Sequence, residues 1–241
     1  MLRYLRDPAM TPVLQSLVTL SAMPLKAVER DFAVDSTGFT TCRFVRWYDH
    51  KWGKERTKRE WVKLHAMCGV TTNVVTAVEM TDYRGADTLQ FRPLLAATAE
   101  HFAIREVSAD KAYSGKKNLQ AVADLGATPF VPFKATRNAG PVPAIHADVT
   151  LPDMASAWMK MYAYFVYQRD TFLTHYHKRS NVETTFSMIK RKFGDSLRSK
   201  SDTGQINEVL CKVIAHNLCC VIAAIHEIGL DDPRFAPAFP A

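Results

Sequence analysis

Short apolar runs with a period of two mark the places along the chain where β-strands are expected. The first is residues 32–35, where Phe32 and Val34 share one face and Ser36-Thr37-Gly38 supplies a turn-prone exit. Alternation over residues 62–67 and a β-branched run over residues 74–80 predict the second and third strands. Shorter strand candidates follow at residues 106–109 and 128–133.

Helical patterns separate and follow these strands. Asp87 is expected to cap a helix that runs to about Phe102, and Ser114 to cap a second helix that ends at Gly126. Long helices are predicted at about residues 154–168, 179–193 and 205–228. Three strands, a helix, a strand, a helix, a strand and then helices describe an α/β fold with a mixed sheet flanked by helices.

Chain length and the positions of glycine and proline residues suggest how the chain is divided. At 241 residues it fits one large domain or two small ones. Residues 1–30 are expected to form a short N-terminal helical extension, residues 31–230 the main domain and residues 231–241 a tail. Within the main domain, the glycines and prolines of residues 134–153 predict an irregular insertion.

Apolar content and cysteine usage indicate a cytoplasmic globular protein. Hydrophobic residues make up 47% of the chain. No segment reaches about 18 uninterrupted apolar residues, since polar and charged side chains interrupt residues 209–228, so no membrane association is expected. The five cysteines include no C-x-x-C pair, which favours reduced thiols over a disulfide framework or a zinc site.

The charge of the chain favours an anionic partner. The formal net charge is +7, as in many proteins that bind nucleic acid. Bases and aromatics alternate between Arg43 and Lys63, and such a stretch can hold phosphates and stack on unpaired bases. An alternative is a solvated hairpin in which Trp47 and Trp61 belong to the core.

Three acidic residues stand out by their position. Asp35 and Asp110 are each expected at the end of a strand, and Glu183 lies on a predicted helix. Ligand sites form at strand ends on one edge of an α/β sheet, and carboxylate oxygens suit Mg²⁺. For any one of these residues, an ordinary cap or surface acid is the alternative.

One stripe of the predicted helix around Glu183 is charged. At about 100° per residue, Arg179, Glu183 and Lys190 fall within roughly 40° of one another, and Tyr176 joins them if the helix extends back to it. The neighbouring stripe is apolar and would dock on the sheet. A carboxylate flanked by two cations suits a metal beside a phosphate, although simple Arg179–Glu183 pairing on a solvated face is an equal alternative.

These residues carry a resemblance to a known family. The pattern Y-x2-R-x3-E-x6-K, present as Tyr176, Arg179, Glu183 and Lys190, resembles the signature of DDE-type insertion-sequence transposases. The segments around Asp35 (residues 32–39) and Asp110 (residues 109–113) and the Lys63-Leu64-His65 strand resemble the same family. The resemblance covers about residues 24–230.

The resemblance implies a fold and a chemistry. The fold is similar to ribonuclease H, with a five-stranded mixed sheet whose third element is antiparallel. Asp35, Asp110 and Glu183 would be catalytic and would hold two Mg²⁺ ions, for which Mn²⁺ can substitute. Tyr176, Arg179 and Lys190 would contact DNA phosphates near the cleaved transposon end. Double-stranded DNA is the expected partner, and the synaptic complex implies a homodimer at the nucleoid.

Two other functions remain open from the sequence. A nuclease of the same fold would cut DNA without joining it, using the same carboxylates. A non-catalytic DNA-binding transposase fragment is the second alternative, since relatives usually carry a longer N-terminal region than the roughly thirty residues before the first strand.

Overall fold

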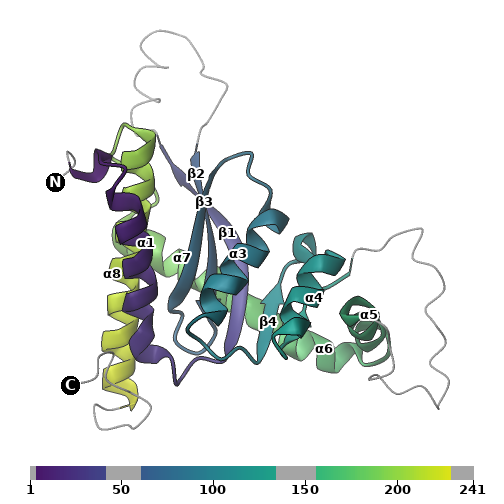
Figure 1. Ribbon diagram of the computed structural model, residues 1–241. Coiled ribbons are helices and arrows are strands. Elements are labelled where there is room, and N and C mark those ends of the chain that lie inside the picture. The colour runs from purple at the N-terminus through teal and green to yellow at the C-terminus, as the bar shows by residue number, and fades with distance from the viewer. Residues whose placement is uncertain (1–3, 42–60, 134–155, 229–241) are drawn as a thin grey trace.

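The computed structural model describes residues 4–41, 61–133 and 156–228 (Figure 1). Most of the basic-aromatic stretch, the predicted insertion at residues 134–153 and the predicted tail at residues 231–241 lie outside the described residues. The described chain is built on a five-stranded sheet in the order β3-β2-β1-β4-β5, with helices on both faces. This is the predicted α/β fold with a mixed sheet of the ribonuclease H type.

The sheet joins an antiparallel half to a parallel half. β2 (Trp61–Gly69) pairs antiparallel with β1 (Asp31–Thr40) and with β3 (Val75–Asp82). β4 (Glu106–Ala109) pairs parallel with β1, and β5 (Thr128–Phe130) pairs parallel with β4. The expectation that the third element is antiparallel is wrong: the second strand is. The turn between β2 and β3 is short, so β3 must reverse direction and again runs parallel to β1.

The first strand is longer than its sequence predicts. Ser36-Thr37-Gly38 was expected to leave the sheet, but β2 pairs with β1 as far as Thr40↔Trp61 and holds these residues extended. Tertiary pairing thus overrides the local turn preference. Gly38 fits because the Trp61 ring covers it, and a Cβ atom there would lie 2.9 Å from Trp61 Cδ1. Asp35 therefore lies inside β1 rather than at its end.

One face of the sheet is covered by α3 (Asp87–Ala99) and α4 (Lys116–Asp124). Phe91 and Leu94 of α3 and Leu119 of α4 are buried in one core cluster with sheet residues. Neither predicted cap is present. The N-cap of α3 is Ala86 and that of α4 is Gly115, and neither makes a side-chain cap hydrogen bond. The Asp87 carboxylate pairs with Lys63 instead, at 2.7 Å.

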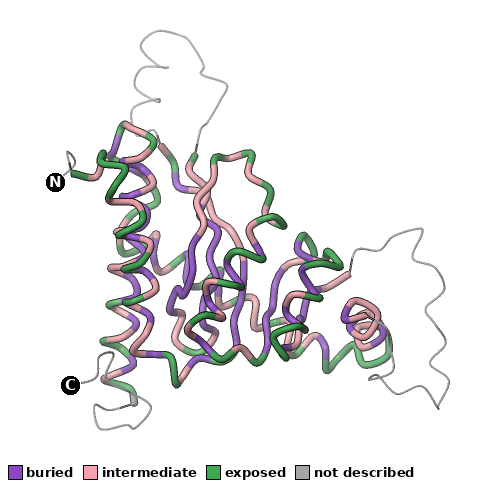
Figure 2. The backbone as a smooth tube through the Cα atoms, viewed as in Figure 1, coloured by how far each residue is buried: buried purple, intermediate pink, exposed green. Residues whose placement is uncertain are grey.

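Two helices from the end of the chain cover the opposite face. α7 (Ser180–Phe193) buries Val182, Phe186 and Ile189 against β1 and β2 in a second core cluster, as its apolar stripe predicts. α8 (Asp202–Ile228) packs on β2 and β3 and begins three residues before its predicted start at Gln205. α1 (Met10–Ala22) runs beside α8, and the two are adjacent in Figure 1. Figure 2 shows buried positions along the inner sides of both helices.

A buried side chain from α8 covers the free edge of the sheet. The Asn217 amide accepts from Val75 N at 2.8 Å and donates to Val75 O at 2.8 Å, so it takes the place of a neighbouring strand on β3. The same amide donates to Val18 O and Ser21 Oγ of α1. Unpaired strand edges invite association with other chains, and here one asparagine ties the edge to both helices.

The long helix α8 also has the length and apolar composition of a membrane span. An 18-residue window within residues 202–227 has a mean hydropathy of 1.8, and 44% of that window is buried inside the protein. Its polar residues are used within the fold: Asn207 bonds Leu5 O and Thr11, Lys212 bonds two backbone oxygens, and His216 bonds Asn73 O. These contacts are those of a core helix.

Two helices lie between the sheet and α7. α5 (Ala157–Tyr167) was predicted, and it starts at an N-cap, Ser156, whose hydroxyl accepts from Met159 N at 3.3 Å. α6 (Arg169–Tyr176) was not predicted, and it is joined to α7 by the 3-10 turn η5 (His177–Arg179). Further 3-10 turns are η1 (Tyr4–Arg6), η2 (Met23–Leu25) and η3 (Lys111–Tyr113).

Candidate active site

Two acid pairs lie on one face of the parallel strands β1 and β4. Asp31 pairs with Glu106 in the register, and the last paired residues are Val34 and Ala109. Asp35 and Asp110 come next on each chain. Side chains alternate between faces along an extended chain, so Asp31 and Asp35 share a face, as do Glu106 and Asp110. A spacing of four residues on both strands therefore sets a second acid pair beside the first.

The first pair, Asp31 and Glu106, is fully compensated by cations. Lys178 Nζ donates to Asp31 Oδ2 at 2.8 Å and also to Glu106 Oε1. Arg105 donates to both Asp31 oxygens, at 2.8 and 2.6 Å, and His175 Nδ1 lies 2.7 Å from Glu106 Oε2. Burial alone would raise the pKa of Asp31, but the hydrogen bonds from Arg105 and Lys178 lower it overall. This pair is a structural clamp between η5 and the sheet.

The second pair, Asp35 and Asp110, has far less compensation. Asp35 Oδ2 accepts from Arg179 Nη1 at 2.8 Å, and Asp35 Oδ1 accepts from Ser36 N at 2.8 Å. The Asp110 carboxylate accepts from Lys111 N at 2.6 Å and thereby begins η3. Burial raises the pKa of Asp35, and the negative charges of Asp110 and Glu183 raise it further. A cation beside these carboxylates would favour their charged form.

Glu183 reaches this region from the first turn of α7. Its Oε1 accepts from Arg179 Nη2 at 2.7 Å, so one guanidinium bridges Glu183 and Asp35. The Glu183 side chain is 55% exposed, against 23% for Asp35. The Asp35 end of this arrangement is therefore mostly buried, and the Glu183 end is exposed to solvent.

The turn η5 places the basic residues. Because Lys178 is held by the first acid pair, the next residue, Arg179, is presented to the second. Tyr176, at the end of α6, is half-buried and packs against the first core cluster. Burial alone would lower the pKa of Arg179, but the hydrogen bond to Glu183 and the nearby negative charges raise it overall. The predicted stripe thus brings Arg179 and Glu183 together, with Tyr176 preceding them on a separate helix.

Lys190 lies further along α7 and does not contact the acids. Its Nζ donates to Thr37 Oγ1 at 2.6 Å and lies 5.5 Å from the centre of the Phe39 ring, with Lys212 Nζ at the same distance. Burial lowers the pKa of Lys190. Thr37 and Asp35 share a face of β1, so Lys190 extends the same surface outward along that strand.

A network that the sequence did not reveal lies behind β1. Asp87 Oδ1 lies 2.7 Å from Lys63 Nζ and 3.3 Å from Nδ1 of the fully buried His65, which also contacts Thr81 Oγ1 at 2.8 Å. Burial raises the pKa of Asp87, but hydrogen bonds from Lys63 and Ser36 lower it overall. Ser36 follows Asp35 in β1, so this network supports the strand from the face opposite the acids. In the sequence, only the Lys63-Leu64-His65 pattern pointed to this network, since it contains both Lys63 and His65.

Comparison with known proteins decides the family. The family described as Transposase DDE domain matches residues 26–218. The chain belongs to this family. No curated protein and no solved structure matches the chain. Membership accounts for the sheet order, and it shows that the chain is a transposase or nuclease domain of the kind that acts in DNA transposition and recombination.

The carboxylates of this transposase domain suit a divalent metal in their donor chemistry. Mg²⁺ prefers oxygen ligands and usually takes one or two carboxylates. Among residues 4–41, 61–133 and 156–228, no three His, Cys, Asp or Glu side chains form a ready-made metal cluster. The Arg179 guanidinium lies between Asp35 and Glu183 instead. A positive charge thus already stands between two of the three acids.

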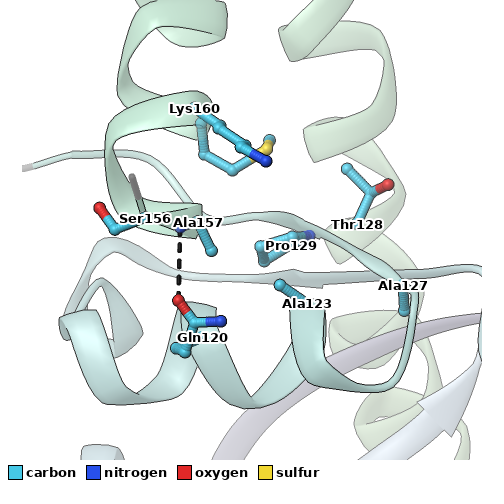
Figure 3. Close-up of a pocket in the computed structure, with 9 residues that line it drawn as sticks. Gln120, Ala123, Ala127, Thr128, Pro129, Ser156, Ala157 and Lys160 are labelled. Atoms are coloured by element: carbon cyan, nitrogen blue, oxygen red, sulfur yellow. Dashed lines mark hydrogen bonds between the residues drawn. The ribbon is translucent and has the colours of Figure 1, made fainter. Parts of the chain in front are cut away.

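The pocket in Figure 3 is lined by other residues than the acids and bases described above. It has a volume of about 370 Å³ and is formed by α4, β5 and the start of α5, where Gln120 Oε1 accepts from Ala157 N at 3.4 Å. Its described lining residues include none of the candidate active-site residues.

Proposed function

We propose that this transposase domain cuts DNA strands and joins them to a target during transposition of an insertion sequence, with Asp35, Asp110 and Glu183 as its catalytic residues. The proposal is supported by three acids that are carried by neighbouring elements of the fold. Two come from adjacent parallel strands and one from the helix packed over them, with Arg179 bonded to Asp35 and Glu183.

The three carboxylates would hold two Mg²⁺ ions, or Mn²⁺ in their place. Bound divalent cations supply Lewis acidity, which makes water or a DNA 3′-hydroxyl a nucleophile and stabilises the departing oxygen of an in-line displacement at phosphorus. Asp35 and Asp110 would contribute ligands from the sheet, and the exposed Glu183 would complete the set from α7. Because Asp35 is mostly buried and Glu183 is exposed, water reaches the site from the side of Glu183.

The basic residues would hold the DNA backbone. Arg179 presents a two-pronged donor, which is the geometry that phosphate prefers, and Lys190 adds a point charge further along α7. Tyr176 is the third proposed phosphate contact. The partner is double-stranded DNA at transposon ends and target, bound at the nucleoid by a homodimer that brings two ends together.

Nicking of supercoiled plasmid in Mg²⁺ or Mn²⁺ tests the catalytic assignment. Wild type should nick, and Glu183→Gln, which keeps the shape of the side chain and removes its charge, should lower the rate by about a hundredfold or more. Glu100→Gln, at an exposed residue beyond α3, is the matched control and should nick at the wild-type rate. Equal nicking by wild type and Glu183→Gln would end the assignment.

Joining is tested separately with a pre-cut DNA end and a plasmid target. A joined product supports a transposase that performs strand transfer. Nicking without joined product would favour the nuclease alternative. DNA binding without nicking by folded wild-type protein, in either metal, would favour the non-catalytic fragment.

A further inference from the structure

Arg179 occupies the position in which the proposed site needs a cation. Its Nη1 and Nη2 arms are both used, at 2.8 Å to Asp35 and 2.7 Å to Glu183. Its side chain is only 21% exposed, and its bond to Asp35 is the more buried of the two, since Asp35 is 23% exposed and Glu183 55%. The guanidinium therefore balances the carboxylates of the metal-free protein.

Carboxylates and a DNA phosphate would compete for the Arg179 guanidinium, because both take the paired N–H donors of arginine. The N–H groups that Arg179 donates to Asp35 and Glu183 are already engaged, so a phosphate would have to displace those bonds to use the same donors. The carboxylate oxygens that accept from Arg179 are also withheld from a metal. One side chain thus links two binding events.

We propose that Arg179 is a displaceable counter-ion: divalent metal takes over Asp35 and Glu183, and the released guanidinium binds a DNA phosphate. This inference rests on the proposed function, since it uses the same carboxylates as metal ligands. It adds that metal and DNA bind cooperatively, and that Arg179 opposes metal binding when DNA is absent. By linkage, each ligand raises the affinity for the other by the same factor.

The clamp beside the site makes such a movement feasible without unfolding η5. Lys178 keeps its contacts to Asp31 and Glu106, and these hold the backbone of the turn while the neighbouring side chain swings. Asp35 keeps its bond from Ser36 N, so the carboxylate stays in place when the guanidinium leaves. Only the rotamer of Arg179 has to change.

Mn²⁺ binding to the full chain in the absence of DNA tests the competition, and free Mn²⁺ is followed by electron paramagnetic resonance. Arg179→Gln should bind Mn²⁺ about tenfold more tightly than wild type, because two charge-assisted hydrogen bonds no longer compete. Arg191→Gln removes the same charge at an exposed position of the same helix and should bind as wild type does. Arg179→Lys, which keeps the charge, should fall between Arg179→Gln and wild type.

Weaker or unchanged Mn²⁺ binding by Arg179→Gln would overturn the inference, because Arg179 would then orient the acids rather than compete for them. Glu183→Gln separates this outcome from failure of the proposed function. If Glu183→Gln loses Mn²⁺ affinity while Arg179→Gln equals wild type, the carboxylate site stands and the competition does not. If Glu183→Gln binds Mn²⁺ as wild type does, the proposed site itself fails.

The predicted cooperativity between metal and DNA binding is tested by a separate measurement. Binding of a short labelled DNA duplex is measured by fluorescence anisotropy at fixed salt, with and without Ca²⁺, a hard cation that prefers oxygen ligands. Wild type and Arg191→Gln should gain affinity severalfold when Ca²⁺ is added. Arg179→Gln should gain clearly less, since it has no guanidinium to release. An equal gain in Arg179→Gln would show that the coupling does not pass through this residue.

Discussion

Lys178 and Arg179 are consecutive in the chain, yet they bond two acids four residues apart on β1, Asp31 and Asp35. The lysine joins a buried, fully compensated acid pair, whereas the arginine joins the pair that we propose as part of the active site. One short 3-10 turn thus connects the stability of the fold to the geometry of the site.

Replacement of Lys178 by methionine should be strongly destabilising. Asp31 and Glu106 are 10% and 7% exposed, and they would lose a shared cation while remaining buried. Removing one partner of a buried ion pair leaves an uncompensated charge, and we expect a loss of about 3 kcal/mol in the free energy of unfolding. Urea unfolding measures it, with Lys192→Met on the exposed face of α7 as the control. A loss no larger than that of the control would contradict the clamp.

The contribution of Asp31 should depend on pH. Its folded pKa is lowered, so its stabilisation is fully present above its unfolded pKa of about 3.9 and is lost as pH falls through the lower folded value. We therefore expect Asp31→Asn to cost about 2 kcal/mol at pH 7 and progressively less below about pH 4. Unfolding at several pH values measures the difference, and Asp124→Asn, at an exposed residue, should show none of this dependence. A difference that is independent of pH would argue against the ion pair.

The network behind β1 should support both stability and the position of the acids. Asp87→Ala leaves Lys63 and the buried His65 without their shared carboxylate, and we expect a loss of about 2 kcal/mol. Plasmid nicking should fall as well, because Ser36 next to Asp35 loses a partner. The exposed Asp82→Ala is the control in both measurements. Full stability in Asp87→Ala would show that the network is dispensable.

Lys190 should contribute to DNA affinity without reading sequence. Lys190→Gln is expected to weaken binding to all duplexes to a similar degree and to reduce the slope of log affinity against log salt by about 1. Filter binding across a salt series measures this. Lys117→Gln, on α4 at the opposite face of the sheet, should leave the slope unchanged. An unchanged slope in Lys190→Gln would remove it from the DNA surface.

Asn217 should be essential to the covered edge of the sheet. Asn217→Ala leaves both polar atoms of Val75 without partners in a buried setting, which we expect to cost about 3 kcal/mol. The exposed Leu218→Ala, one residue further along α8, should cost much less. Thermal and urea unfolding measure both. A small loss in Asn217→Ala would mean that water replaces the amide and that the edge is not closed.

Local patterns were sufficient to predict most of the fold. The alternation of residues 62–67 and the apolar stripe of α7 lie in local sequence, and the structure confirms both elements. From Leu64 onward β2 is buried on both faces rather than on one. The prediction was wrong where distant pairing decides the outcome. β1 continues to Thr40 only because β2 lies beside it. α6 was missed because its sequence is mostly polar and buries only Phe172.

The candidate site was predictable in part for the same reason. Arg179 and Glu183 are four residues apart on one chain segment, so their contact follows from helical spacing. The clamp does not follow from any spacing, since Lys178 lies 147 residues from Asp31 and 72 from Glu106. Asp87 was expected to cap a helix, and its bonds to β2 became visible only once the sheet was assembled.

Asp31 and Asp35 on β1 are four residues apart, as are Glu106 on β4 and Asp110 just after that strand, so the register that pairs Asp31 with Glu106 also aligns Asp35 with Asp110. If β4 slipped along β1, Glu106 would leave Asp31, and the ammonium group of Lys178 could no longer serve both. A sheet with shifted register would therefore bury an unpaired charge, which would lower its free energy of unfolding. The relative position of Asp35 and Asp110 is thus set by the Asp31–Glu106 pair and Lys178, which take no part in the proposed chemistry. Substitutions of the proposed catalytic residues therefore leave the contacts that fix this register unchanged.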